Sequence, residues 1–188
     1  FRSNLPYERS DLNSKTVLNI GRLTNDKNQI ALLRIWEKIM KTQTLRDWDL
    51  KIVGGGENYL LLKSYITTNN IPNVQILPPV SDIEKYYKSA SVYVSTSRSE
   101  GFPMVLVESV SFGLPTIAFD CPTGPDEILN NDSGVLIKLG DEVEFVNKLD
   151  ELMLNPELRI KYAEKAYARS SNWGEVEIME KWNKIFSV

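Results

Sequence analysis

The sequence predicts an α/β fold, a Rossmann-like three-layer α/β/α sandwich with a parallel sheet of about six strands. From residue 16 onward, short runs of β-branched and apolar residues alternate with longer segments of helical periodicity. The composition suits one domain with a core of its own, since 42% of the 188 residues are hydrophobic and 25% are charged. Strands that alternate with helices form parallel sheets covered on both faces, with right-handed connections.

Six segments have the composition of buried strands. The first, Thr16 to Ile20, is a short β-branched and apolar run, and the second is followed at once by three glycines. The predicted strands span residues 16–20, 48–53, 74–77, 90–95, 115–119 and 134–137.

Helical periodicity fills most of the sequence between these strands. Ile30, Leu33 and Trp36 recur at the spacing of one helix face. Gly113 is placed to end a later helix, and Pro115 prevents that helix from continuing. The predicted helices span residues 26–40, 57–69, 102–112, 141–154 and 156–186, the last with a break near residue 171. Ser81, with Glu84 three residues later, is a candidate cap for the start of a further helix.

The composition argues against several classes of protein. Cys121 is the single cysteine, so an internal disulfide is impossible, and a small buried residue in a reducing compartment is expected. The absence of histidine removes the commonest general base and most zinc sites. A formal charge of -3 without a basic tract argues against nucleic acid as a partner. Without a signal peptide or an apolar run of roughly 20 residues, a cytoplasmic location is expected.

The chain divides into a short polar segment and a domain. Residues 1–15 contain one proline and have the character of a hinge or linker, whereas residues 16–188 form the predicted domain. Ligands of such folds bind at the carboxyl ends of the strands. Chemistry is therefore expected in the loops after the first five strands, at residues 21–27, 54–57, 77–81, 96–104 and 120–126.

The loop after the first strand contains a glycine and two cations. Gly21 would let the backbone approach a ligand, and Arg22 and Lys27 would suit a diphosphate. The alternative is a solvated turn with ordinary surface cations.

The next two loops carry backbone features rather than reactive side chains. Gly54 and Gly56 permit close approach of the backbone to a ligand, although a plain turn explains them as well. Pro79 and Val80 lie in a rigid extended loop whose free carbonyls and amides could contact a flat base edge. Alternatively, this loop only leads into a helix.

The segment from Glu100 to Glu108 is the most informative part of the chain. Gly101 gives the loop freedom, and the helix start at residues 102–106 offers unpaired amides that attract phosphate. Glu108 lies among apolar residues, where a carboxylate is costly unless hydrogen-bond donors satisfy it. The vicinal hydroxyls of a ribose would do so. The alternative is a glutamate turned to solvent or capping a neighbouring loop.

These motifs occur in an order that resembles the C-terminal domain of family 4 glycosyltransferases of GT-B fold. Two glutamates separated by seven residues, Glu100 and Glu108, are the hallmark of that family. The resemblance covers nearly the whole chain through Gly21-Arg22-Leu23 with Lys27, residues 53–56, 77–80 and 97–108, Gly113-Leu114-Pro115, residues 124–127 and Ser133-Gly134.

The resemblance implies a role for each matching residue. Arg22 and Lys27 would hold the donor diphosphate and offset leaving-group charge, Glu100 would contact hydroxyls of the transferred sugar, and Glu108 would bind the ribose. Further donor contacts are implied for Gly21, Gly54, Gly56, Pro79, Val80, Gly101, Phe102, Met104 and Val105.

The resemblance also implies a division of labour between two domains. Such enzymes are typically retaining and metal-independent, so no metal or other cofactor is expected, and the nucleoside diphosphate sugar, here UDP-linked, is a substrate. A glycan or lipid-linked acceptor would be bound by an N-terminal domain that this chain lacks. Surface glycan or polysaccharide biosynthesis, with peripheral association of the full-length enzyme at the inner face of the membrane, is the implied setting.

Two other interpretations remain open at this point. The chain could be a stand-alone nucleotide-binding or interaction module without transferase activity. It could also be half of a GT-B-shaped sugar-nucleotide epimerase. If the two-domain interpretation is right, the domain alone should bind donor weakly and transfer little.

Overall fold

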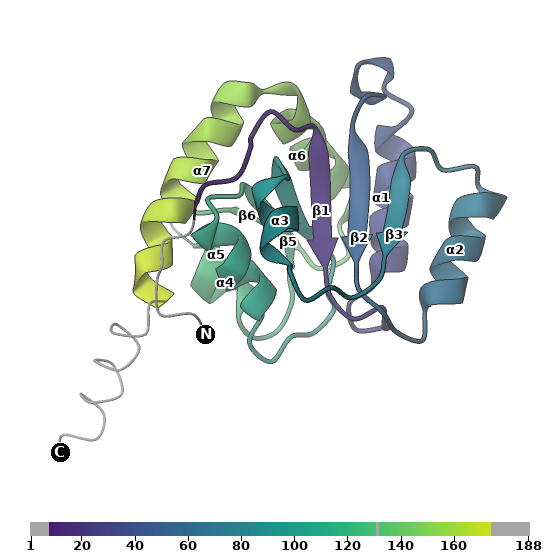
Figure 1. The fold of residues 1–188 in the computed structure, drawn as a ribbon, viewed down its shortest axis with the longest axis horizontal. Helices are drawn as coiled ribbons and strands as arrows, with labels where there is room; N and C mark the ends of the chain where they lie inside the picture. Colours follow the sequence, from purple (N-terminus) through teal and green to yellow (C-terminus); the bar gives the residue numbers. More distant parts are fainter. Residues whose placement is uncertain (1–7, 131, 174–188) are drawn as a thin grey trace.

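A six-stranded parallel sheet forms the centre of the molecule (Figure 1). The computed structural model describes residues 8–130 and 132–173. The strands are β1 Thr16–Ile20, β2 Asp49–Val53, β3 Val74–Leu77, β4 Val92–Ser95, β5 Thr116–Asp120 and β6 Val135–Lys138. They lie in the order β3-β2-β1-β4-β5-β6, and every neighbouring pair is parallel. The predicted fold class and all six predicted strands are confirmed.

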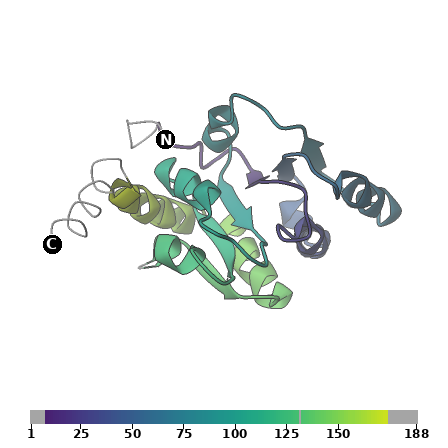
Figure 2. The same cartoon turned by 90° about the horizontal axis from the view of Figure 1, so that it is seen from below.

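Helices cover both faces of this sheet, as Figure 2 shows from below. They are α1 Gln29–Ile39, α2 Tyr59–Thr68, α3 Glu84–Lys88, α4 Met104–Ser111, α5 Pro125–Leu129, α6 Glu142–Leu154 and α7 Pro156–Ser170, with short 3-10 helices at Gln43–Leu45 and Ser171–Trp173. Helices α1 and α6 pack together on one face, and α4 packs against α7 on the other. Each face therefore buries its own apolar cluster, one around Trp36 and one around Tyr87 and Phe112.

Several element boundaries differ from the sequence prediction. Ser81 does not cap a helix, because α3 begins at Glu84 and no side-chain hydrogen bond caps its start. Helix α4 begins at Met104 rather than Phe102, because Pro103 lies outside helical geometry with a ψ of 81°. Helix α5 lies in a stretch that the sequence suggested was loop, since five residues are too few for a periodic pattern. The predicted helix beyond residue 173 lies outside the described residues.

The start of the described chain is hydrogen-bonded to the domain. The amide of Ser10 donates to the carbonyl of Phe112 at 3.0 Å, and that of Asp11 donates to the carbonyl of Lys88 at 2.8 Å. The buried guanidinium of Arg159 donates to the carbonyl of Leu12 at 3.1 Å. These contacts bring residues 10–12 to the ends of α3 and α4 and to α7. Whether residues 1–15 form a hinge to a further domain stays a prediction.

Membrane-spanning helices and metal-binding clusters are both absent from residues 8–130 and 132–173. None of the helices there has both the length and the apolarity to cross a bilayer. No group of three or more cysteine, aspartate or glutamate side chains in that part of the chain is placed to hold a metal ion. Cys121 is buried, in agreement with its interpretation as a small core residue, and burial raises the pKa of its thiol.

Candidate functional site

The sheet has a switch point between β1 and β4, where the order of the strands reverses direction. Parallel α/β sheets bind ligands at such a point, outside the carboxyl ends of the strands. The loops that follow β1 and β4 are tied together there. The amide of Arg98 donates to the carbonyl of Asp26 at 2.7 Å, and the hydroxyl of Thr96 donates to the carbonyl of Asn28 at 3.1 Å.

An ion pair joins the same two loops. The Lys27 ammonium donates to both carboxylate oxygens of Glu100, at 2.6 Å to Oε1 and 2.5 Å to Oε2. The side chain of Glu100 is 6% exposed and that of Lys27 is 21% exposed, so the pair is largely screened from water. Two residues with separately predicted roles are thus direct partners in this structure.

A cleft of about 310 Å³ opens at the carboxyl ends of β1 and β2, and neither Lys27 nor Glu100 is among the residues that line it. Arg22 is exposed at its edge, and Glu108 is half-buried in its wall. The structure therefore brings together residues from four separate predicted motifs. The lining residues are Ile20, Gly21, Arg22, Val53, Gly54, Gly55, Pro79, Val80, Ile83 and Glu108.

The glycines after β2 serve the packing of two loops against each other. A Cβ atom on Gly54 would lie 1.9 Å from the carbonyl oxygen of Gly21, and one on Gly56 would lie 2.5 Å from that of Leu23. The amide of Leu23 donates to the carbonyl of Gly55 at 2.9 Å and so fixes the two loops side by side. Gly54 also lines the cleft, whereas Gly56 does not. Close packing of the two loops explains why glycine occupies positions 54 and 56. Of these two glycines, only Gly54 also lines the cleft.

Glu108 has a partner that sequence reasoning missed. The hydroxyl of Tyr87, on α3, donates to Glu108 Oε2 at 2.6 Å. Burial, and to a smaller extent the nearby carboxylate of Glu108, raises the pKa of Tyr87 well above its ordinary value. The Tyr87 hydroxyl therefore stays protonated and acts as a donor. No sequence signal links the two residues, because they lie on different helices 21 positions apart.

The start of α4 lies next to the cleft but does not line it. Gly101 has open space around it, and Phe102 is 43% exposed with its ring 5.5 Å from that of Trp173. The amide of Met104 donates to the carbonyl of Phe102 at 2.9 Å, whereas no acceptor in the described residues reaches the amide of Val105. One of the two amides predicted to meet phosphate is therefore engaged within its own turn.

A loop after β5 supports this region from outside. The hydroxyl of Thr123 donates to the carbonyl of Glu100, and a Cβ on Gly124 would lie only 2.4 Å from Cδ of Pro103. Residues 123–124 therefore hold the turn that leads into α4. The sequence did not assign Thr123 this contact, and nothing in the local pattern indicates it.

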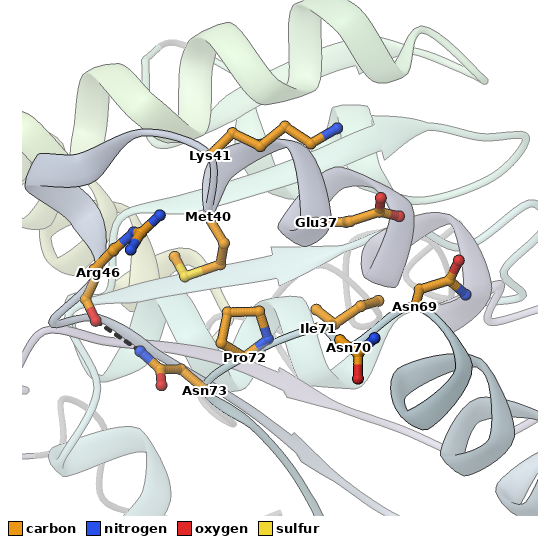
Figure 3. A pocket seen from close by; sticks show the side chains of 9 residues that line it. All are labelled: Glu37, Met40, Lys41, Arg46, Asn69, Asn70, Ile71, Pro72 and Asn73. Carbon is orange, nitrogen blue, oxygen red and sulfur yellow. Dashed lines mark hydrogen bonds between the residues drawn. The ribbon is translucent and has the colours of Figure 1, made fainter.

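A larger cavity of about 470 Å³ lies at the opposite, amino-terminal edge of the sheet (Figure 3). Two of its asparagines donate hydrogen bonds to the backbone of the turns that form it. Asn73 donates from its side chain to the carbonyls of Arg46 and Trp48, and Asn69 donates to that of Tyr65. Because this cavity lies away from the carboxyl ends of the strands, where parallel α/β sheets bind ligands, it is the weaker candidate. Its lining is Glu37, Met40, Lys41, Arg46, Asn69, Asn70, Ile71, Pro72 and Asn73.

The chain matches the model of a known protein family over most of its length. Residues 4–169 match the family described as Glycosyl transferases group 1. The chain belongs to this family. Every predicted motif at the carboxyl edge of the sheet lies inside the matched range, so the chain is a glycosyltransferase domain.

Individual relatives of the group 1 family show the same relationship. The amylovoran biosynthesis glycosyltransferase AmsD of Erwinia amylovora is 40% identical over 172 residues, which are 91% of this chain and 48% of AmsD. An alpha-1,4-N-acetyl-D-galactosaminyltransferase of Campylobacter jejuni, whose name includes a PP-undecaprenol-linked glycan, is 28% identical over 189 residues. That match covers 100% of this chain and 52% of the relative.

Solved glycosyltransferases have the same fold. A crystal structure of TarM from S. aureus, in complex with Fondaparinux, alpha-GlcNAc-glycerol and UDP, superimposes with a TM-score of 0.86 at 25% sequence identity. The superposition covers 98% of this chain and 37% of that TarM chain. The α/β sandwich described above thus has the Rossmann-like fold found in GT-B glycosyltransferases, and this chain spans about half the length of AmsD.

Proposed function

We propose that this chain is the donor-binding domain of a two-domain glycosyltransferase, and that its cleft binds a UDP-linked sugar. The observation that carries the proposal is a cleft at the carboxyl edge of the sheet, which brings Glu108 together with Arg22 and with the loops that contain Gly54 and Pro79. Its volume of about 310 Å³ is at the lower end of the range of roughly 300–1,000 Å³ for small-molecule sites. The TarM structure in complex with UDP supports the choice of nucleotide.

The nucleotide is assigned to the lining of the cleft. Glu108 would accept hydrogen bonds from the ribose hydroxyls, since a carboxylate can only accept at neutral pH. The backbone around Pro79 and Val80 would contact the base. The diphosphate would lie toward Arg22 and Lys27, whose positive charges would offset the charge of the leaving group.

The transferred sugar is assigned to the turn before α4. Glu100 would accept from its hydroxyls, and Gly101, with open space around its Cα, would allow the sugar to come close. Phe102 lies exposed beside it, and the free amide of Val105 would contact sugar or phosphate. These assignments place the anomeric carbon between the nucleotide site and the ion pair of Lys27 with Glu100.

The reaction we propose is retaining transfer without a metal ion, to a glycan or lipid-linked acceptor held by an N-terminal domain. The names of AmsD and of the Campylobacter relative support a role in polysaccharide or lipid-linked glycan assembly. We place the enzyme in the cytoplasm, at the inner face of the membrane, where a lipid-linked acceptor would lie. Transfer by the two-domain enzyme that persists in EDTA would support metal independence, and loss of transfer would refute it.

Calorimetric titration of this chain with UDP tests the donor assignment. Glu108→Ala should weaken UDP binding by at least tenfold, as expected when hydrogen bonds to a charged group are lost. Glu37→Ala is the matched control, because Glu37 also contacts a tyrosine hydroxyl but lines the cavity at the opposite edge. It should leave UDP affinity unchanged. Equal UDP affinities for the wild type and Glu108→Ala would refute the ribose assignment.

A further inference from the structure

Tyr87 is held rigidly next to the cleft although it does not line it. The residue is completely buried, and its ring stacks on that of Phe112 at 5.0 Å with an interplanar angle of 8°. The ring of Tyr93 lies 6.0 Å away on the other neighbouring element, β4. Because these rings fix the aromatic plane, the Tyr87 hydroxyl has a defined position, from which it donates to Glu108 Oε2.

Because of this hydrogen bond, the two carboxylate oxygens of Glu108 have different surroundings. Oε2 accepts from Tyr87 at 2.6 Å, whereas no donor among the described residues reaches Oε1. Glu108 lines the cleft, so its second oxygen is available to a ligand there. Without this hydrogen bond, the Glu108 side chain could populate several rotamers. Ligand binding would then restrict it to one rotamer at a cost in conformational entropy.

A purely structural explanation of Tyr87 fits the contacts less well. A buried tyrosine hydroxyl needs an acceptor, but a backbone carbonyl is sufficient. Tyr93 shows this, since its hydroxyl donates to the carbonyl of Ile20 at 3.1 Å. Tyr87 instead uses a charged side chain of the cleft wall as its acceptor, which links the buried ring cluster to the binding surface.

We propose that Tyr87 is a positioning residue for nucleotide binding: it holds Oε2 of Glu108 so that Oε1 accepts from the ribose hydroxyls. This inference rests on the proposed function, because it takes Glu108 to be the ribose ligand. The Tyr87 hydroxyl thereby contributes to selection of ribose over a sugar without vicinal hydroxyls, without contacting the nucleotide itself.

The test compares UDP with 2′,3′-dideoxyuridine diphosphate, which lacks both ribose hydroxyls, by calorimetric titration of this chain. Tyr87→Phe keeps the stacked ring and removes only the hydroxyl. It should weaken UDP binding about tenfold and dideoxy binding less than about twofold, because only UDP uses the positioned oxygen. Tyr65→Phe is the matched control, since it also removes a tyrosine–glutamate contact, at 3.5 Å to Glu37, away from the cleft. Tyr65→Phe should leave the preference for UDP over the dideoxy nucleotide unchanged.

The outcomes separate this inference from the proposed function. If the wild type does not bind UDP at millimolar concentration, both fail together. If Glu108→Ala abolishes the preference for UDP but Tyr87→Phe retains it, the ribose assignment stands and the positioning role is overturned. An equal loss of affinity for both nucleotides in Tyr87→Phe would also overturn it, because that result marks a general structural effect.

A second variant covers the case in which Tyr87→Phe does not fold, as judged by circular dichroism. Phe112→Leu removes the stacked neighbour and leaves the Tyr87 hydroxyl in place. The less tightly packed Tyr87 ring should reduce the preference for UDP over the dideoxy nucleotide about threefold, which is a smaller effect than that expected of Tyr87→Phe. An unchanged preference in folded Phe112→Leu would contradict the proposal that the fixed ring orients Glu108.

Discussion

The exposed fractions of Lys27 and Glu100 predict how much each member of their ion pair contributes to the free energy of unfolding. The two side chains come from loops on either side of the switch point, 73 positions apart in the sequence. The Glu100 side chain is 6% exposed and the Lys27 side chain 21% exposed. Removal of either partner leaves the other charge without compensation in a region poor in water, but the remaining charge is not equally buried in the two cases.

The structure therefore predicts unequal costs. Lys27→Met leaves the more buried carboxylate unpaired, and removal of one member of a buried pair costs about 3–5 kcal/mol, so we expect about 3 kcal/mol. Glu100→Gln leaves an ammonium group that water reaches more easily, and solvent screening should reduce the cost to about 1–2 kcal/mol. The double variant should be less destabilised than the sum of the two single variants, by about 1–2 kcal/mol.

Urea denaturation followed by circular dichroism measures these free energies of unfolding. Lys148→Met is a suitable control, because Lys148 pairs with Glu144 and Glu151 on the exposed surface of α6. It should change the free energy of unfolding by less than about 0.5 kcal/mol. Equal costs for Lys27→Met and Glu100→Gln, or additive costs in the double variant, would refute the argument from burial.

Three further predictions concern other parts of the chain. Gly54→Ala should destabilise the fold by about 3 kcal/mol or more, because the new Cβ would meet the carbonyl of Gly21 at 1.9 Å, whereas Gly101→Ala, with nothing within 4 Å, should cost about 0.5 kcal/mol or less in the same urea titration. Arg159→Met should cost about 3 kcal/mol, since the buried guanidinium donates to three backbone carbonyls, and hydrogen exchange near residue 12 should accelerate. Burial raises the pKa of the Asp150 carboxyl above its ordinary value of 3.8. The contribution of Asp150 to the free energy of unfolding is therefore full below pH 3.8 and is lost as the pH rises through the raised pKa, where the buried carboxyl ionises. Asp150→Asn should consequently stabilise the fold at pH 7 and not at pH 3.

The fold was accessible from the sequence because its signals are local and repeated. Each strand is a short apolar run bounded by turn residues, and helices such as α1 carry long periodic patterns, so both kinds of element could be located. Short helices could not be located in this way. The five-residue helices α3 and α5 have too few turns for periodicity. The capping-box pattern at Ser81 indicated a helix three residues before α3 begins, whereas no pattern indicated α5.

The candidate site was predictable in part, for a related reason. The rule that ligands bind at the carboxyl edge depends only on topology, so the loops with Arg22 and Glu100 could be assigned to one edge of the sheet. Glu108 was assigned from its apolar neighbours and from the family resemblance. The partners of those residues could not be assigned. Tyr87 reaches Glu108 from another helix, and Lys27 pairs with Glu100 across the switch point, so both contacts depend on three-dimensional placement. The glycines after β2 were also only partly predictable. The sequence pattern identified them as a possible ligand loop, but it did not show that Gly54 is needed for the close packing of two loops.

The different partners of the two glutamates indicate how the proposed site would respond to its donor. Glu108 accepts from a hydroxyl at Oε2, so a ribose can bind at Oε1 without displacing this protein contact. Glu100 is held by a cation that the proposal also assigns to the diphosphate. A diphosphate that approaches Lys27 must therefore compete with Glu100, and the carboxylate released from Lys27 needs new hydrogen-bond donors. The hydroxyls of the transferred sugar would supply them, which UDP alone could not. On this argument the intact sugar nucleotide should gain more from Glu100 than UDP does, and Glu100→Gln should narrow the difference between their affinities.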